Sequence, residues 1–160
     1  MIGSDYEKVR PDLKKVRDPY SGNDYIVVPP VRPDVAVIHG LKGSPFGAVT
    51  VLGLRSDRLL AMAAIKTVAV VEEIVDPDDV LPGRDEIYIA PIHVDAVVPA
   101  ARGAHPTACP GRYDADVAHL MAYTVASSGE ASFRKYLDTY IFGPADHEAY
   151  LRLVDMEKPS

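Results

Sequence analysis

Two short apolar runs, separated by one helical pattern, constrain the fold of this chain more than any other feature. Residues 35–38 and 68–75 are continuously apolar or rich in β-branched side chains, which is typical of buried parallel strands. Residues 57–66 between them have helical spacing, and Ser56 and Asp57 can cap that helix. Two strands joined through a helix form a right-handed crossover. The sequence therefore predicts an α/β fold with an open, mainly parallel sheet that is flanked by helices.

The remaining elements are shorter, and turn residues separate them. Further short strands and three C-terminal helices are expected, with a loop at 40–47 and an N-cap at Asp146. The expected strands are 25–28, 48–52, 87–90 and 94–98, and the expected helices are 115–127, 132–141 and 146–154. We divide the 160 residues into a polar N-terminal arm at 1–24, one domain at 25–155 and a disordered tail at 156–160.

Charge and composition narrow the class of protein. The net charge is -6 and the pI is about 5.3, which argues against a general nucleic-acid binder and against attraction to anionic membranes. No apolar run approaches the length of a membrane span, and the polar start does not resemble a signal peptide. The single cysteine, Cys109, excludes an internal disulfide. We expect a soluble cytoplasmic protein without nucleic-acid or membrane partners.

A loop of about seventeen residues, 98–114, is rich in glycine and proline. Loops of that length in compact domains usually line a site or an interface. Within it, we expect His105 to be more exposed than a core histidine and able to polarise a thioester carbonyl, with Arg102 nearby. Cys109 lacks the strand-to-helix setting of a nucleophile and is better interpreted as a small packing residue.

Other candidates end the two predicted parallel strands, at the edge where open α/β sheets bind ligands. Glu72 and Glu73 point to opposite faces, so at most one lines a given pocket; the alternative is a solvated strand end or an inter-subunit ion pair. His39, Gly40 and Ser44 belong to a region whose backbone N–H groups could bind a phosphate or an amide. The alternative for these three is an ordinary hydrogen-bonded turn.

The sequence does not predict a metal site. The five histidines do not cluster with carboxylates at ligand spacing. Asp146, His147 and Glu148 stand together, but at the start of a helix they are better interpreted as an N-cap followed by charged residues.

Several separate segments, in order along the chain, resemble one enzyme family. They include the stretch at 18–39, VVEEIVDP at 70–77, GAHP at 103–106 and GRYD at 111–114. Together they resemble the second half of the α-type subunit of family I CoA-transferases, the glutaconate and 3-oxoacid CoA-transferase group. The resemblance covers about residues 3–152.

This resemblance implies an open α/β fold and a component of an enzyme that moves coenzyme A between carboxylic acids. A glutamate of the β-type subunit would carry the enzyme-CoA thioester, and coenzyme A or acyl-CoA would be the substrate. The implied partners are a β-type subunit and the N-terminal half of an α-type subunit. We expect the chain to be inactive alone, to form a homo-oligomer in isolation, and to supply pocket walls without a nucleophile. The pocket candidates are His39, Gly40, Ser44, Glu72, Glu73, Arg102, Gly103 and His105.

Two alternatives remain open at this stage. Some family relatives hydrolyse CoA esters, with water in place of the acceptor acid, and this half of the subunit does not separate them from transferases. A non-catalytic module that binds acyl-CoA or serves as a scaffold would keep the same fold.

Overall fold

The computed structural model describes residues 2–3, 5–53 and 56–156. The expected tail at 156–160 lies outside these residues apart from Met156, which ends the last helix. The elements in chain order are α1 (Tyr6–Val9), β1 (Lys14–Arg17), β2 (Asp24–Val27), β3 (Val35–Gly43), β4 (Val49–Leu52), α2 (Asp57–Ala63), β5 (Lys66–Ile74), η1 (Pro77–Asp79), β6 (Glu86–Ile89), η2 (Pro91–His93), β7 (Ala96–Pro99), α3 (Val117–Ala126), α4 (Glu130–Tyr140) and α5 (His147–Met156).

Five strands form the main sheet, in the order β6-β4-β3-β5-β7. Strands β3, β5 and β7 pair in parallel, whereas β4 is antiparallel to both β3 and β6. Only β4 therefore runs against the other four strands of this sheet. The predicted neighbours, at 35–38 and 68–75, are β3 and β5, with Val37 opposite Val68. The predicted α/β fold with a mainly parallel sheet is confirmed.

One face of the sheet carries the hydrophobic core. Ile38, Val49, Val71 and Ile89 are buried there, and Ala61 of α2 packs against them. The expectation that residues 35–38 are buried on both faces is wrong, because Val35 and Val37 are 56% and 65% exposed. Alternate residues of a strand face opposite sides, and the helix α2 covers only the side of Ile38.

Strand β3 is longer than the sequence predicts, so the expected loop at 40–47 is wrong at its start. Gly40 lies within the strand, and pairing with β5 continues as far as Gly43. A Cβ on Gly40 would stand 2.6 Å from Val49 Cγ1 and 3.0 Å from Val71 Cγ1. Glycine is needed here because neighbouring core side chains fill the space above it.

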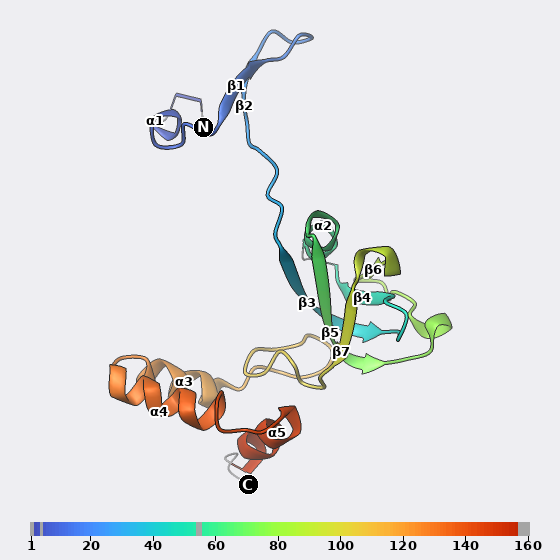
Figure 1. The fold of residues 1–160 in the computed structure, drawn as a ribbon, viewed down its shortest axis with the longest axis vertical. Coiled ribbons are helices and arrows are strands. Elements are labelled where there is room, and N and C mark those ends of the chain that lie inside the picture. The colour runs from blue at the N-terminus through green and yellow to red at the C-terminus, as the bar shows by residue number, and fades with distance from the viewer. Residues whose placement is uncertain (1, 4, 54–55, 157–160) are drawn as a thin grey trace.

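The N-terminal segment contains a hairpin that the sequence predicts only in part. Strands β1 and β2 pair with each other in a separate two-stranded sheet, which projects away from the main sheet (Figure 1). The predicted strand at 25–28 is β2, whereas β1 is unexpected because three of its four residues are basic. The boundary that we placed at residue 24 falls inside this hairpin.

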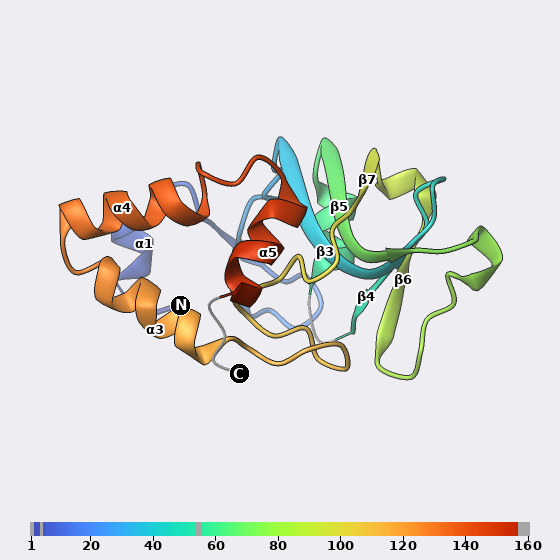
Figure 2. The same ribbon diagram turned by 90° about the horizontal axis from the view of Figure 1, so that it is seen from below.

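The three predicted C-terminal helices are all present. Helices α3 and α4 pack as a hairpin to one side of the sheet, and α5 lies between them and the strands (Figure 2). Asp146 caps α5 as expected, since its Oδ1 accepts the N–H of Ala149 at 2.7 Å. In the described part of the chain, no helix combines the length and apolar character that crossing a membrane requires.

Candidate functional site

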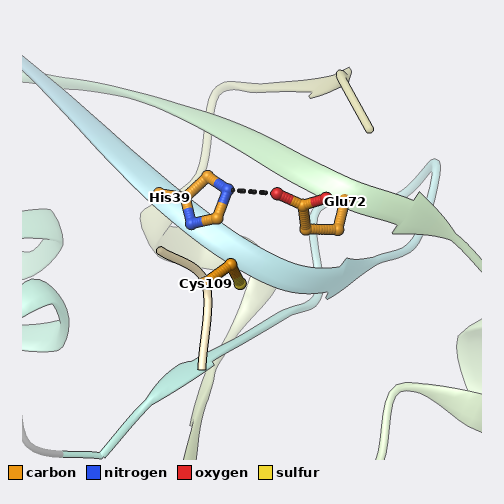
Figure 3. Close-up of side chains that lie close together, drawn as sticks. All are labelled: His39, Glu72 and Cys109. Atoms are coloured by element: carbon orange, nitrogen blue, oxygen red, sulfur yellow. Dashed lines mark hydrogen bonds and ion pairs between the residues drawn. The ribbon is translucent and has the colours of Figure 1, made fainter. Parts of the chain in front are cut away.

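The candidate site is organised around the Glu72 carboxylate, on the sheet face opposite the core. His39 lies on this face of β3, and its Nε2 is 2.8 Å from Glu72 Oε1 on the neighbouring strand β5 (Figure 3). The Glu72 side chain is only 5% exposed. His39 and Glu72 thus lie together beneath the long loop, but His39 stands in the middle of β3 and not at the end of its strand, where the sequence places it.

Two loop residues bind the same carboxylate. The backbone N–H of Arg102 donates to Glu72 Oε2 at 2.6 Å, and the Tyr113 hydroxyl donates to Glu72 Oε1 at 2.6 Å. The Tyr113 oxygen also accepts the N–H of Ala104 at 2.9 Å. One side chain of the sheet thus holds both ends of the loop between Arg102 and Tyr113.

These contacts set the charge state of the pair. Burial raises the pKa of Glu72, but hydrogen bonds from Tyr113, the Arg102 N–H and His39 outweigh it and hold the pKa below its usual value. Burial and the neighbouring Glu72 carboxylate raise the pKa of Tyr113. Glu72 is therefore an ionised acceptor and Tyr113 a neutral donor at neutral pH.

Arg102 has an unusual backbone. Its φ is 58°, the one positive value at a non-glycine residue among those described. Its guanidinium Nη1 lies 2.7 Å from Asp155 Oδ1 on α5. Two contacts hold the loop at this residue: Glu72 binds its backbone N–H, and Asp155 of α5 binds its guanidinium.

His105 is buried, so the expectation of an exposed imidazole is wrong. Its side chain is 3% exposed, with Nδ1 2.7 Å from the Tyr150 hydroxyl and Nε2 3.3 Å from Asp116 Oδ2. Desolvation lowers its pKa, against the hydrogen bond to Asp116. A neutral ring that donates from Nε2 and accepts at Nδ1 satisfies both partners. Helices α3 and α5, which supply these partners, cover a loop that looks open in the sequence.

The loop borders two hollows in the surface. One, of about 490 Å³, is lined by Arg102, His105, Tyr113 and residues 114–118, which lead into α3. The other, of about 660 Å³, is lined by Leu41, Leu52, Gly53, residues 84–86, Pro110 and Gly111. A loop between two hollows is placed to contact a bound molecule.

The other predicted candidates are held by other contacts. Glu73 is 49% exposed and pairs with Arg112 of the same loop at 3.2 Å. Gly40 is enclosed in β3, and Ser44 is buried in the turn to β4, where its Oγ accepts the N–H of Ala48 at 3.2 Å. Gly103 approaches the protein itself, because a Cβ there would meet the Ala100 carbonyl oxygen at 2.8 Å.

One cluster resembles a set of metal ligands. A nitrogen of His39, an oxygen of Glu72 and Sγ of Cys109 lie within 4.8 Å of one another (Figure 3). Cys109 is buried, in agreement with a packing role. Both oxygens of Glu72 already accept hydrogen bonds, so the arrangement is explained by positioning of the loop.

Sequence reasoning missed four residues of the site. Tyr113, Asp116, Tyr150 and Asp155 supply the contacts to Glu72, His105 and Arg102. Tyr113 lies in the GRYD segment at 111–114. Its position as the one aromatic residue among polar neighbours could have marked it as a candidate. The other three are 11 to 53 residues from their partners in the chain, and no local pattern marks them.

Comparison with models of protein families shows to which family the chain belongs. The family model described as coenzyme A transferase matches residues 1–100 of the chain. The chain belongs to the coenzyme A transferase family. The predicted resemblance is confirmed. Glu72, Glu73 and His39 lie inside the matched region, and the loop at 102–113 follows it.

Individual relatives extend the similarity through the loop. The chain is 34% identical over 148 residues to the A-type subunit of glutaconate CoA-transferase from Acidaminococcus fermentans, covering 91% of this chain and 46% of that one. It is 32% identical over 149 residues to the A-type subunit of 3-oxoadipate CoA-transferase from Pseudomonas knackmussii, covering 92% and 52%. The crystal structure of the Acidaminococcus fermentans glutaconate CoA-transferase superposes with a TM-score of 0.81 at 31% identity, covering 95% of this chain and 53% of that chain. The chain spans about half the length of these relatives.

Proposed function

We propose that the chain is one component of a CoA-transferase that moves coenzyme A between carboxylic acids. The observation that carries the proposal is the family match together with two relatives that are A-type subunits of CoA-transferases. Coenzyme A and acyl-CoA are then substrates, and a B-type subunit is the partner. Under this proposal the assembly works in the cytoplasm.

The reaction needs a nucleophile that this chain does not supply in the described site. A carboxylate of the partner attacks the acyl-CoA carbonyl and expels the CoA thiolate, which leaves an acyl-glutamyl anhydride. The thiolate then attacks the glutamyl carbonyl, so the carboxylic acid leaves and an enzyme-CoA thioester remains. Glu72 is unsuited to the first step because it is buried and binds three donors.

The role we assign to this chain is to form one wall of the site. Arg102 and the first turn of α3 line the hollow of about 490 Å³, together with Asp114 and Asp116. Asp116 already caps α3, so Arg102 is the group that binds an anionic substrate, such as a carboxylate, by exchanging its pair with Asp155. His105 itself lines this hollow and binds Asp116, which lines it too, while Tyr150 holds the other ring nitrogen.

The experiment is purification of the assembly from native cells through this chain, followed by an acyl-CoA exchange assay. We expect a B-type partner to copurify, the assembly to exchange labelled coenzyme A between acids, and the chain alone to be inactive. Release of free coenzyme A without an acceptor acid would indicate a hydrolase of the same family. Absence of any acyl-CoA chemistry in the assembly would support a binding or scaffold module instead.

A further inference from the structure

The face of the main sheet opposite the core carries exposed apolar side chains on β3 and β7. Val35 and Val37 of β3 are 56% and 65% exposed, and Val98 of β7 is 43% exposed. Register places these strands side by side through β5, with Val37 opposite Val68 and Val70 opposite Val98. Sheets that are mainly parallel normally have both faces covered, so this face is built to be buried.

The β1–β2 hairpin has a second apolar face. Val16 stands opposite Tyr25, and Val27 lies on the same side of the ribbon, with Lys14 opposite Val27 at the edge of this face. Val16, Tyr25 and Val27 are 43%, 51% and 42% exposed. The other side carries Lys15, Arg17, Asp24 and Ile26, and Lys15 Nζ pairs with Asp24 at 3.0 Å. The hairpin is therefore amphipathic, and it projects from the body on the segment that leads directly into β3 (Figure 1).

The turn gives the hairpin its shape without help from the rest of the chain. The N–H of Asp18 donates to the Asn23 carbonyl at 2.8 Å, and the Asp18 carboxylate accepts the N–H groups of Tyr20 and Ser21. Gly22 supplies the positive φ of 71° that the turn needs. Two isolated strands are only marginally stable in water, so the preformed hairpin needs a surface on which to pack.

The comparison with relatives indicates what occupies these faces. The glutaconate CoA-transferase structure matches 95% of this chain, hairpin included, but only 53% of the relative's own chain. In that relative, the same hairpin and sheet belong to a polypeptide with almost as much again outside the match. That unmatched remainder is the occupant we select, because in the relative it belongs to the same polypeptide as the matched part.

We propose that the apolar hairpin face and the uncovered sheet face form one docking surface for a domain equivalent to the unmatched half of the relative's A-type subunit. The identity of this domain rests on the proposed function. The hairpin contacts the domain through Val16, Tyr25 and Val27. The domain also covers Val35 and Val37 and so forms the second layer over this face of the sheet.

The test is coexpression of this chain with the part of the Acidaminococcus fermentans A-type subunit that lies outside the match. The positive control is the matched part of that subunit, coexpressed with the same unmatched part. It defines conditions under which the two halves associate. We expect a one-to-one complex by light scattering and slowed hydrogen exchange at residues 14–17, 24–27 and 35–38. The double variant Val16→Ser/Tyr25→Ser and the variant Val37→Ser should each weaken association by about tenfold or more. The matched control Lys15→Ser, on the opposite side of the hairpin, should change it less than about threefold.

Two results would overturn the docking surface. One is no association under conditions in which the control pair associates. The other is a homodimer of this chain that the Val16→Ser/Tyr25→Ser variant dissociates, which would make a second copy the occupant. A complex that forms as expected but fails to exchange coenzyme A after addition of the B-type subunit contradicts the proposed function and leaves the docking surface standing.

Discussion

Glu72 Oε2 accepts the backbone N–H of Arg102 at 2.6 Å, and Arg102 has a left-handed backbone with φ of 58°. A buried carboxylate of the sheet thus holds a strained residue of the loop 30 positions later. The same carboxylate binds Tyr113, where the loop returns. This one side chain therefore holds both ends of the candidate loop.

Replacement of Glu72 by glutamine tests this role. The amide of Glu72→Gln keeps the volume but loses the charge and places N–H groups against donors. We expect the free energy of unfolding to fall by about 2 kcal/mol, since hydrogen bonds to buried charged groups contribute about 1.5–3 kcal/mol. Urea denaturation measures it. The control Glu73→Gln loses a half-exposed ion pair and should change the free energy by less than about 0.5 kcal/mol; equal effects would contradict the account.

The strain at Arg102 predicts a difference between two substitutions. Arg102→Gly and Arg102→Ala both remove the pair with Asp155, but only glycine adopts a positive φ without cost. We expect the glycine variant to be more stable than the alanine variant by about 1 kcal/mol, measured by thermal and urea unfolding. An alanine variant at least as stable as the glycine variant would show that the left-handed backbone is not strained.

The corrected position of Gly40 can be checked in the same way. A methyl group there would meet Val49, Val71 and the Thr50 carbonyl oxygen at 2.6–3.1 Å. Gly40→Ala should therefore destabilise the fold by about 3 kcal/mol through overpacking. Gly83→Ala is the control, because its Cβ would meet only the flexible side chain of Glu86 at 3.2 Å and beyond. If Gly40 lay in a loop, the two variants would have similar free energies of unfolding.

Burial of His105 predicts a dependence of stability on pH. Its folded pKa is lowered, so below about pH 6.5 the unfolded chain binds a proton that the folded chain does not. Stability is full above that pH and falls with acidification, by at most about 1.4 kcal/mol per pH unit from this group. His105→Gln should reduce the loss between pH 7 and pH 5. Urea unfolding of both proteins at the two pH values measures this difference. If both proteins lose the same free energy of unfolding, a group other than His105 causes the pH dependence.

The sequence predicts the elements better than it predicts their surroundings. The pairing of β3 with β5 follows from two apolar runs and one helix, which are local patterns. Exposure of Val37 could not be predicted, because the pattern shows that a face is apolar and does not show what covers it. Burial of His105 depends on Tyr150, 45 residues away, and the hold of Glu72 on the loop depends on a backbone N–H, which no side-chain pattern indicates.

The central claim is that this chain forms a wall of a CoA-transferase site whose nucleophile lies on a partner. Mass spectrometry of the active assembly after incubation with acyl-CoA tests it most directly. We predict that one glutamate of the B-type partner gains the mass of coenzyme A less one water, as a thioester requires, while this chain stays unmodified. A coenzyme A adduct on Glu72 or Glu73 of this chain would contradict the account.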